Sequence, residues 1–398
     1  MSVLLGAVGW LLAAAAGIPL AVFSMELLAG LAPARGARDG AAAQGQAAIL
    51  IPAHDEAAGI AATLAALFEE ATPGTRVLVV ADNCSDETAR IARQAGAEVV
   101  ERQDPQARGK GYALAFGRDH LARTGATPPD VVLVLDADCR LLPGSVAVLA
   151  KAAVHHGVPV QAINLIEADL GAPPMVQISS FAMLVKNLYR SRGMQRLGGA
   201  ALLTGTGMAF PWKLFAGADL ATGSIVEDLA LGIAMTRAGH PPRLVGEAGV
   251  RSAPADMADA LAQRTRWEHG FLQTLKGQAL PVLLGALRSG SRAELLLGLH
   301  LAVPPLALLL ILAAAALALQ ALLAALGGSV AALVVLGALT ALALLLVVVA
   351  WLGGGRPFLS AAALLRAPLY VLWKLPLYAG FLRKPEARWT RTPRRPPQ

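Results

Sequence analysis

The chain has 398 residues, 56% of them hydrophobic, and its mean hydropathy of +0.56 is too high for an ordinary soluble enzyme. The net charge of +7 could indicate a nucleic-acid partner, but the basic residues gather beside the apolar segments. We therefore expect anionic lipid headgroups as their partners, and no nucleic acid.

Three apolar segments are long enough to cross a bilayer. The first, Val3–Leu31, carries one charge, at Glu26, and lacks the basic start of a signal peptide. The other two, Leu295–Leu326 and Val330–Leu352, carry no formal charge. The predicted segments are a transmembrane helix over 1–34, a linker over 35–46 and a two-helix transmembrane hairpin over 294–353.

Basic residues beside these segments indicate the orientation. They follow the first span, precede the second and crowd the C-terminus, and they include Arg35, Arg38, Arg288, Arg292, Arg383, Lys384, Arg388, Arg391, Arg394 and Arg395. By the positive-inside rule, all three places face the cytoplasm. We therefore predict an integral protein of a bacterial inner or plasma membrane with a cytoplasmic central domain over 47–270.

Two further apolar stretches contain charges and prolines. Phe271–Leu287 contains Lys276 and Pro281, and Phe358–Leu382 contains two basic residues and two prolines. We predict an interfacial amphipathic segment over 271–293, and a second one over 354–398 that ends in a basic cytoplasmic tail. Whether 358–382 cross the membrane is left open.

Strands and helices alternate in the central domain. The expected strands are Ala47–Pro52, Arg76–Ala81, Glu98–Arg102 and Val131–Leu135, and the expected helices are Ala58–Glu70, Glu87–Ala95, Gly111–Arg123 and Gly144–His155. This order predicts an α/β domain with a mostly parallel sheet and right-handed crossovers. Carboxylates follow three of the strands, so they meet at the sheet edge where ligands bind.

The segment Val131–Cys139 ends in two carboxylates, Asp136 and Asp138, that point to the same side of the chain. Such a pair suits a hard cation, Mg²⁺ or Mn²⁺. A surface turn that is merely acidic would explain a lone Asp-x-Asp equally well. A phosphate-binding loop is excluded at Gly109-Lys110, because Asp104 stands where that motif needs its first glycine.

Two later motifs each have a structural alternative. Glu227-Asp228 opens an expected helix, where two carboxylates could simply favour the positive end of the helix dipole. Gln263, Arg266 and Trp267 fall on one helix face, where an arginine beside a tryptophan is often only a stacked surface pair. Neither motif alone indicates a site.

Taken in order, six motifs resemble those of family 2 glycosyltransferases, and more narrowly the membrane-bound branch with cellulose, chitin and hyaluronan synthases. They are Ile51-Pro-Ala-His-Asp-Glu56, Asp82-Asn-Cys-Ser-Asp86, Gly109-Lys-Gly-Tyr112, Asp136-Ala-Asp138, Glu227-Asp228 and Gln263-x-x-Arg266-Trp267. The resemblance covers about residues 47–275. It implies a GT-A fold, typical of nucleotide-diphospho-sugar transferases, and an inverting sugar transfer.

The resemblance also implies roles for single residues. On the donor side, Pro52 and Glu56 would line the nucleoside pocket, Asp82 would contact the base, Lys110 would lie near the nucleotide, and Asp136 would contact the nucleotide-sugar. Asp138 would hold the Mg²⁺ or Mn²⁺ ion that bridges the diphosphate. On the acceptor side, Asp228 would be the base with Glu227 in support, and Gln263, Arg266 and Trp267 would hold the diphosphate and the acceptor sugar.

The expected function is metal-dependent transfer of a sugar, with UDP as the expected nucleotide, to a lipid-linked sugar or a growing polysaccharide at the cytoplasmic face. Processive synthases usually have more spans than three, so a translocating synthase that works as an oligomer or with polysaccharide-assembly partners is the alternative. A nucleotidyltransferase would not explain the Gln-x-x-Arg-Trp motif. A membrane scaffold or transporter would not explain why Asp82, Asp136, Asp138 and Asp228 are all present.

Two positions depart from the family pattern. Asp55 stands where the family commonly has Asn, and Ser224-Ile-Val226 precedes Glu227 where a Thr directly before Glu-Asp is common. The second departure weakens the role implied for Asp228.

Overall fold

The computed structural model describes residues 2–32, 46–71, 74–125, 127–222, 226–252 and 257–383, without the side chains of 257–264 and 382. Most of the predicted linker and the tail beyond 383 therefore lie outside the described residues, as do Arg35, Arg38 and Ser224-Ile225. The chain forms two compact units. We call Ala34–Glu167 with Ala200–Gln263 the α/β unit, and Met1–Pro33, Ala168–Gly199 and Arg264–Glu386 the helical unit.

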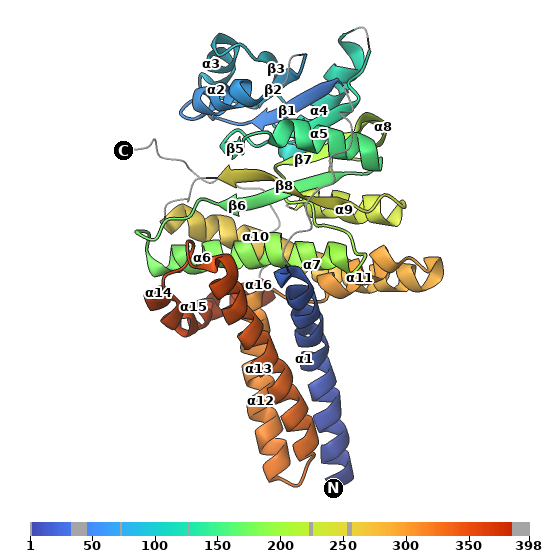
Figure 1. The fold of residues 1–398 in the computed structure, drawn as a ribbon, viewed down its shortest axis with the longest axis vertical. Helices are drawn as coiled ribbons and strands as arrows, with labels where there is room; N and C mark the ends of the chain where they lie inside the picture. Colours follow the sequence, from blue (N-terminus) through green and yellow to red (C-terminus); the bar gives the residue numbers. More distant parts are fainter. Residues whose placement is uncertain are drawn as a thin grey trace. The chain divides into compact units, whose positions relative to one another are not determined.

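The α/β unit is built on one eight-stranded sheet with the order β3-β2-β1-β4-β7-β6-β8-β5 (Figure 1). Its strands are β1 (Ala47–Ala53), β2 (Arg76–Asp82), β3 (Glu98–Arg102), β4 (Val131–Val134), β5 (Cys139–Leu141), β6 (Val160–Ile166), β7 (Met208–Pro211) and β8 (Arg243–Ser252). The first four are parallel to one another in the order β3-β2-β1-β4, as the alternation of strands and helices predicts. Residues of β1, β2 and β4 are almost all buried because helices cover both sheet faces, whereas those of β3, at the sheet edge, are partly exposed.

Six helices of this unit pack on the two faces. They are α2 (Ile60–Glu70), α3 (Thr88–Gln94), α4 (Lys110–Arg123), α5 (Ser145–His156), α8 (Trp212–Ala216) and α9 (Glu227–Arg237). Apolar residues of α2, α3 and α5 form one core with the sheet, and those of α4, α8 and α9 form the other. A glycine lets α4 approach closely, because a Cβ at Gly117 would lie 2.4 Å from Leu50 Cδ1.

The second half of the sheet is mixed rather than parallel. β7 runs antiparallel to both β4 and β6, and β5 runs antiparallel to β8, while β6 and β8 are parallel. The chain enters the helical unit over Ala168–Gly199 before it forms β7. β7 is therefore not reached through a short βαβ crossover, the connection that makes neighbouring strands parallel.

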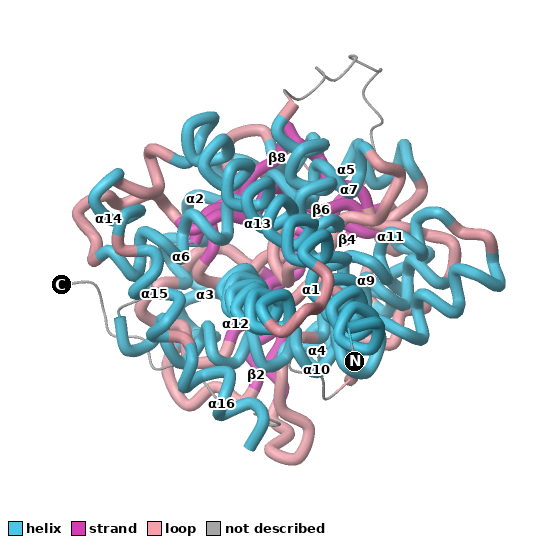
Figure 2. The backbone as a smooth tube through the Cα atoms, turned by 90° about the horizontal axis from the view of Figure 1, so that it is seen from below, coloured by secondary structure: helices cyan, strands magenta, loops and turns pink. Residues whose placement is uncertain are grey.

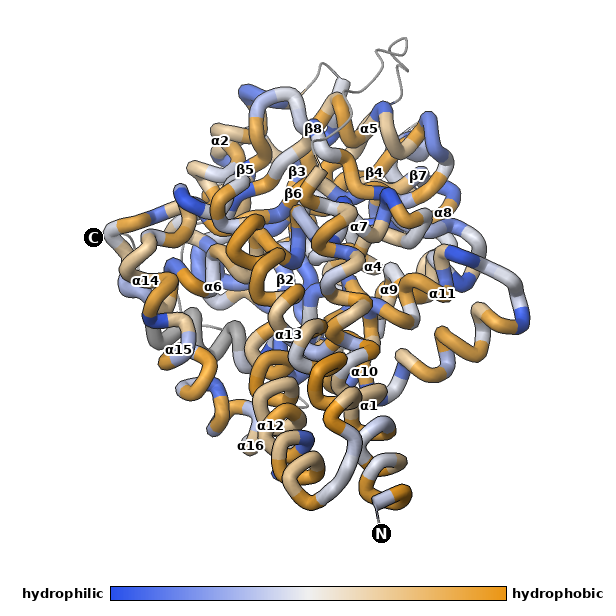
Figure 3. The backbone as a smooth tube through the Cα atoms, turned by 60° about the horizontal axis from the view of Figure 1, so that its bottom comes forward, coloured by the Kyte–Doolittle hydropathy of each residue, from blue (hydrophilic) through white to orange (hydrophobic). Residues whose placement is uncertain are grey.

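The described residues of the helical unit include three helices that are long and apolar enough to cross a membrane. These are α1 (Ser2–Leu31), α12 (Leu306–Ala325) and α13 (Val330–Ala350), the last continued by the π-helix η2 (Trp351–Gly355). They lie side by side (Figure 2), and apolar residues dominate them (Figure 3). Their number agrees with the three predicted spans.

Among the unit's other helices, the π-helix η1 (Val185–Arg190) and α7 (Ser191–Arg196) cross α1 at close range. The remaining ones are α6 (Pro174–Leu184), most of α10 (Met257–Ser289), α11 (Arg292–Leu301), α14 (Ala361–Leu365), α15 (Ala367–Trp373) and α16 (Leu375–Arg383). A Cβ at Gly30 would lie 1.8 Å from the carbonyl oxygen of Tyr189, and one at Gly193 the same distance from that of Glu26. Only glycine permits this approach of two backbones.

Buried charges reinforce the crossing. The Arg190 guanidinium donates to the Glu26 carboxylate at 2.7 Å, and Nδ1 of His300 lies 2.9 Å from the other carboxylate oxygen. All three residues are buried. The lone charge of the first apolar segment is thus paired with groups far along the chain, and removal of one partner would leave the other buried without compensation.

Three helix boundaries differ from those expected. Leu295–Leu326 is not one span, because Pro304-Pro305 separates α11 from α12. The stretch after residue 270 continues α10 without a break and contains Pro281 inside the helix. The amphipathic stretch Phe358–Leu382 forms three short helices rather than one continuous helix, with prolines in the first turn of α15 and near the start of α16.

Candidate active site

Lys110 links the turn after β4 to the loop before β7. It stands at the first position of α4, and its ammonium group donates to Oδ1 of Asp136 and, at 2.8 Å, to the carbonyl oxygen of Gly205. The backbone amide of Asp136 in turn donates to the Thr206 hydroxyl at 3.0 Å. Three segments far apart in the sequence therefore meet at one lysine.

Acidic groups surround the Lys110 ammonium. Burial by itself would lower the pKa of Lys110, but attraction to Asp136, and then to Glu227 and Asp228, raises it above its ordinary value. The lysine therefore stays protonated at neutral pH. A positive charge held among carboxylates is an arrangement that can receive a phosphate and a metal ion.

Glu227 and Asp228 form the first turn of α9, as predicted. Burial, and secondly the charge of Asp228, raises the pKa of the Glu227 carboxyl to about 7. The Asp228 carboxylate accepts a hydrogen bond from the backbone amide of Leu229 at 2.8 Å. Two adjacent carboxyl groups thus differ in environment, which is a common feature of acid–base sites.

A small cavity connects these groups. It is lined by Lys110, Gly111, Leu114, Gly205, Met208, Asp219, Leu220, Glu227, Asp228 and Leu231. The predicted residues Lys110, Glu227 and Asp228 therefore share one cavity, and Asp136 is bonded to its lysine. Asp219 also faces this cavity, a position that the sequence motifs do not indicate.

The loop before β7 is a part of the site that the sequence motifs do not reveal. Gly205 has φ of +84°, and a Cβ there would lie 3.3 Å from both Asp228 Oδ2 and the Lys110 ammonium. The repeated Thr-Gly over 204–207 is the one signal that could have indicated this loop, since glycines mark backbone that approaches other groups closely.

The turn after β4 also offers ligands for a metal ion. Asp136, Asp138 and Cys139 each present one atom, and these atoms all lie within 4.8 Å of one another. Burial, and then the charge of Asp138, raises the pKa of the Cys139 thiol well above its ordinary value. Carboxylate oxygens are the donors that fit Mg²⁺ or Mn²⁺, whereas a thiol suits softer metals.

Asp82, at the end of β2, lies on the side predicted to hold the nucleoside. Its carboxylate accepts from Arg102 at 2.7 Å and from the side chain of Asn83 at 3.0 Å, and its carbonyl oxygen lies 2.7 Å from Nδ1 of His54. Pro52 is half-buried in β1, and the backbone amide of Glu56 donates to the Thr88 hydroxyl at 2.7 Å. The loops after β1 and β2 thus form one surface.

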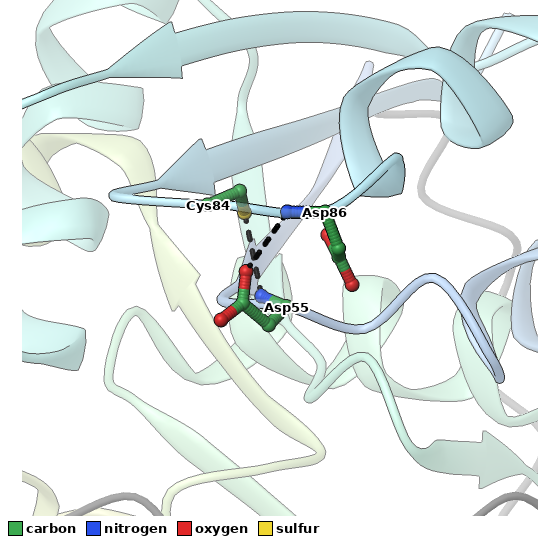
Figure 4. A group of neighbouring side chains, drawn as sticks. All are labelled: Asp55, Cys84 and Asp86. Atoms are coloured by element: carbon green, nitrogen blue, oxygen red, sulfur yellow. Dashed lines mark hydrogen bonds between the residues drawn. The ribbon is translucent and has the colours of Figure 1, made fainter.

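A second acidic group joins these two loops. Asp55, Cys84 and Asp86 also present atoms within 4.8 Å of one another (Figure 4). Asp55 accepts from the backbone amides of Ser85 at 2.6 Å and Asp86 at 3.3 Å, and burial raises the pKa of the Cys84 thiol to about 11. We interpret this group as a clasp between loops, because its Asp55 carboxylate already accepts backbone hydrogen bonds from the other loop.

The Gln-x-x-Arg-Trp motif lies on α10. The side chain of Gln263 lies outside the described residues, whereas Arg266 and Trp267 belong to the helical unit. Trp267 has 38% of its surface exposed. The roles implied for these three residues stay predictions.

Residues 44–270 match the model of a family described as "Glycosyltransferase like family 2". Among solved structures, the chain is similar to the mannosyltransferase PcManGT from Pyrobaculum calidifontis in complex with GDP-Man and Mn2+. The two are 21% identical, the match covers 93% of this chain and 99% of that chain, and the TM-score is 0.57. A search of curated proteins gives no match.

Two other solved structures share less of the chain. Mannosyl-3-phosphoglycerate synthase from Rubrobacter xylanophilus is 20% identical over 57% of this chain and 72% of that chain, with a TM-score of 0.39. Glucosyl-3-phosphoglycerate synthase from Mycobacterium tuberculosis, in complex with Mn2+, UDP and glucosyl-3-phosphoglycerate, is 23% identical over 56% and 78%, with a TM-score of 0.38. The family match and the likeness to the Pyrobaculum structure confirm the GT-A fold.

Proposed function

The chain belongs to the glycosyltransferase-like family 2, and from this premise we propose that it is an inverting enzyme that moves a sugar from a nucleotide-diphospho-sugar to a membrane-associated acceptor. The observation that carries the proposal is the cavity on which Lys110, Glu227 and Asp228 converge. Such a site supplies a cation for the leaving diphosphate and a carboxylate for the acceptor hydroxyl.

On the donor side, Asp136 and Asp138 would hold Mg²⁺ or Mn²⁺, which neutralises charge on a diphosphate when bound. Lys110 already donates to Asp136, so its ammonium group can also hold a phosphate oxygen at this turn. Asp82 would accept a hydrogen bond from the base, and Pro52 and Glu56 would line the rest of the nucleoside pocket.

The nucleotide expected from the family resemblance is UDP. The Pyrobaculum structure holds GDP-Man, so both nucleotides belong in an experimental test.

On the acceptor side, Asp228 would take the proton of the attacking hydroxyl. Glu227, whose pKa burial and the charge of Asp228 raise to about 7, would support it. A positioned base contributes roughly 10²–10⁴-fold to such a transfer. A single displacement inverts the anomeric centre and needs no second carboxylate as nucleophile.

The diphosphate and the acceptor sugar would meet Gln263, Arg266 and Trp267. An arginine fork suits a diphosphate, and the face of an indole suits the apolar side of a sugar ring. These roles rest on the order of the motifs.

The three apolar helices support a membrane-bound acceptor, either a lipid-linked sugar or a growing polysaccharide, at the cytoplasmic face. The placement in a bacterial inner membrane is part of the same proposal, and it rests on the basic residues beside the spans. A processive synthase like those of cellulose or hyaluronan, working as an oligomer, is the alternative. Production of long polymer by the purified chain alone would favour it.

The test is a panel of UDP- and GDP-sugars incubated with membranes that contain the protein, with Mg²⁺ or Mn²⁺. We expect metal-dependent nucleotide release and label transferred to a membrane product for one donor. Asp228→Asn should lower transfer about 10²–10⁴-fold. Asp119→Asn is the matched control, because Asp119 lies on α4 with its side chain half exposed and paired with Arg118. Full transfer by Asp228→Asn would refute the proposed mechanism.

A further inference from the structure

The helix turn that follows Arg266 and Trp267 is bound to the C-terminal segment of the helical unit. Glu268 Oε1 accepts from the Lys374 ammonium, and Glu268 Oε2 accepts from the Tyr378 hydroxyl at 2.8 Å. Both carboxylate oxygens of Glu268 are therefore occupied by residues about a hundred positions later in the chain. We call Glu268, Lys374 and Tyr378 the α10 clamp.

The lysine of the α10 clamp is buried, so it needs a charged partner. Lys374 has 2% of its surface exposed, and its ammonium also lies 5.3 Å from the centre of the Tyr370 ring. A lysine buried to this extent requires a carboxylate partner, because an uncompensated charge in such a place is strongly unfavourable. Glu268 is its partner here, so α10 and the C-terminal segment are joined at this turn.

The next residue of α10 strengthens this connection. Nε2 of His269 donates to the carbonyl oxygen of Leu377 at 3.1 Å, and the His269 ring packs edge-on against Phe381, with 5.3 Å between ring centres. His269 is buried. Glu268 and His269, two consecutive residues of α10, are thus held by α16 and by Lys374, the residue that precedes α16.

Helix geometry transmits this constraint to the residues before it. Successive side chains of an α-helix are rotated by about 100° around the axis, so fixing Glu268 and His269 fixes the direction of Trp267 and Arg266. Trp267 is 38% exposed, while its two successors are held in place. The turn is therefore anchored on one face and presents the tryptophan on another.

We propose that the α10 clamp positions Arg266 and Trp267 for the acceptor side of the reaction, so that the C-terminal amphipathic segment is a part of the catalytic apparatus. This rests on the acceptor role proposed above for Arg266 and Trp267. Glu268, Lys374 and Tyr378 are positioning residues that act through these neighbours. The segment with the buried lysine then has a function besides contact with lipid.

The experiment compares Tyr378→Phe with Tyr370→Phe in membranes, with the labelled donor that the panel identifies. Tyr378→Phe removes one hydrogen bond to a charged group and keeps the ring, so it should fold. Two rates are measured, namely label transferred to membrane product and nucleotide released by hydrolysis of the donor. We expect Tyr378→Phe to lower the ratio of transfer to hydrolysis about tenfold. Tyr370→Phe, whose hydroxyl does not contact Glu268, should leave the ratio unchanged.

A second comparison addresses the ion pair. Glu268→Gln should lower the ratio as well, and joining it to Lys374→Met should restore the amount of folded protein without restoring the ratio, because neither side chain then carries an unpaired charge. If transfer and hydrolysis fall in parallel with the amount of folded protein, the clamp is merely structural and the inference is wrong.

Trp267→Ala separates the two proposals. If it leaves transfer unchanged, the acceptor role of the motif fails. If it abolishes transfer while Tyr378→Phe leaves the ratio unchanged, only the role of the clamp fails.

Discussion

Two clusters of the α/β unit look alike in composition but differ in what already binds their oxygens. Asp136, Asp138 and Cys139 follow β4, and Asp55, Cys84 and Asp86 join the loops after β1 and β2. In the first cluster, the cation of Lys110 is bonded to Asp136 beside a cavity. In the second, backbone amides occupy the Asp55 carboxylate. Proximity of ligand atoms is therefore not enough to indicate a metal site.

The largest expected effect comes from replacing Asp138 of the first cluster, with Asp55 of the second cluster as the comparison. Asp138→Asn should lower metal-dependent transfer about 10²–10³-fold, because a metal ion contributes several kcal/mol and loses a ligand. Asp55→Asn should change transfer only a few-fold, since an amide oxygen can still accept from the Ser85 and Asp86 amides. The measurement is label transfer against Mn²⁺ concentration. Equal losses in the two variants would contradict the distinction between a metal site and a clasp.

The carboxyl pair Glu227 and Asp228 predicts that the stability of the protein depends on pH. The pKa of Glu227 is raised from 4.5 to about 7, so the folded state holds this proton more tightly than the unfolded chain. The protonated Glu227 carboxyl therefore contributes fully to the free energy of unfolding below pH 4.5, and this contribution is lost as pH rises through about 7. At about 1.4 kcal/mol per pKa unit, the loss approaches about 3 kcal/mol.

Glu227→Gln removes the ionisation and should therefore stabilise the protein at pH 8 relative to the unmodified chain, with little difference at pH 4.5. Thermal unfolding in detergent at both pH values measures this. Glu87→Gln, at an exposed position paired with Arg90, is the control that should show no such gain. A gain of the same size at both pH values would mean that the carboxyl pair is not the cause.

A smaller effect is expected in the loop that meets Lys110. Gly205→Ala places a side chain at φ of +84° and within 3.3 Å of Asp228 Oδ2. The backbone strain amounts to about 1–2 kcal/mol, and transfer should fall about tenfold as the carboxylate shifts. Gly239→Ala has the same positive φ with no atom within 4 Å of the new Cβ, so it should lose stability but not specific activity. Specific activity of the folded fraction distinguishes the two.

The smallest effect is expected at the thiol of the clasp. Cys84→Ser should alter transfer less than about twofold, because Cys84 serves the loop contact rather than a metal ion. Since burial raises the pKa of Cys84 to about 11, its alkylation should be slow at pH 7 and accelerate with pH up to that value. Protection of Cys84 from alkylation by Mn²⁺ would show that the second cluster does bind metal.

Local sequence pattern was sufficient for much of the α/β unit. The apolar runs that became β1, β2, β3 and β4 are bounded by turn residues and alternate with helices, and this pattern alone implies parallel neighbours. The acidic residues at their ends then had to meet at one edge. The ordered motifs added the family, because six weak signals in series exclude most alternatives.

Contacts between distant segments could not be predicted in the same way. The antiparallel pairing of β7 with β4 and the approach of Gly205 to Lys110 each depend on where the chain returns after a long excursion. No local pattern in the sequence predicts where the chain returns to the sheet. Glu26 illustrates this, since a lone charge in an apolar helix gives no indication that Arg190 will neutralise it.

The sequence by itself determined the class of enzyme, the parallel half of the sheet, the three apolar helices and the acidic residues from which a site could be built, because composition, periodicity and motif order are local properties. Only the tertiary structure decided which acidic cluster has a cation and a cavity beside it, and that Lys374 is buried against Glu268 rather than exposed at a membrane surface. The reason is physical: burial and pairing depend on every segment that packs around a group, and those neighbours come from all parts of the chain.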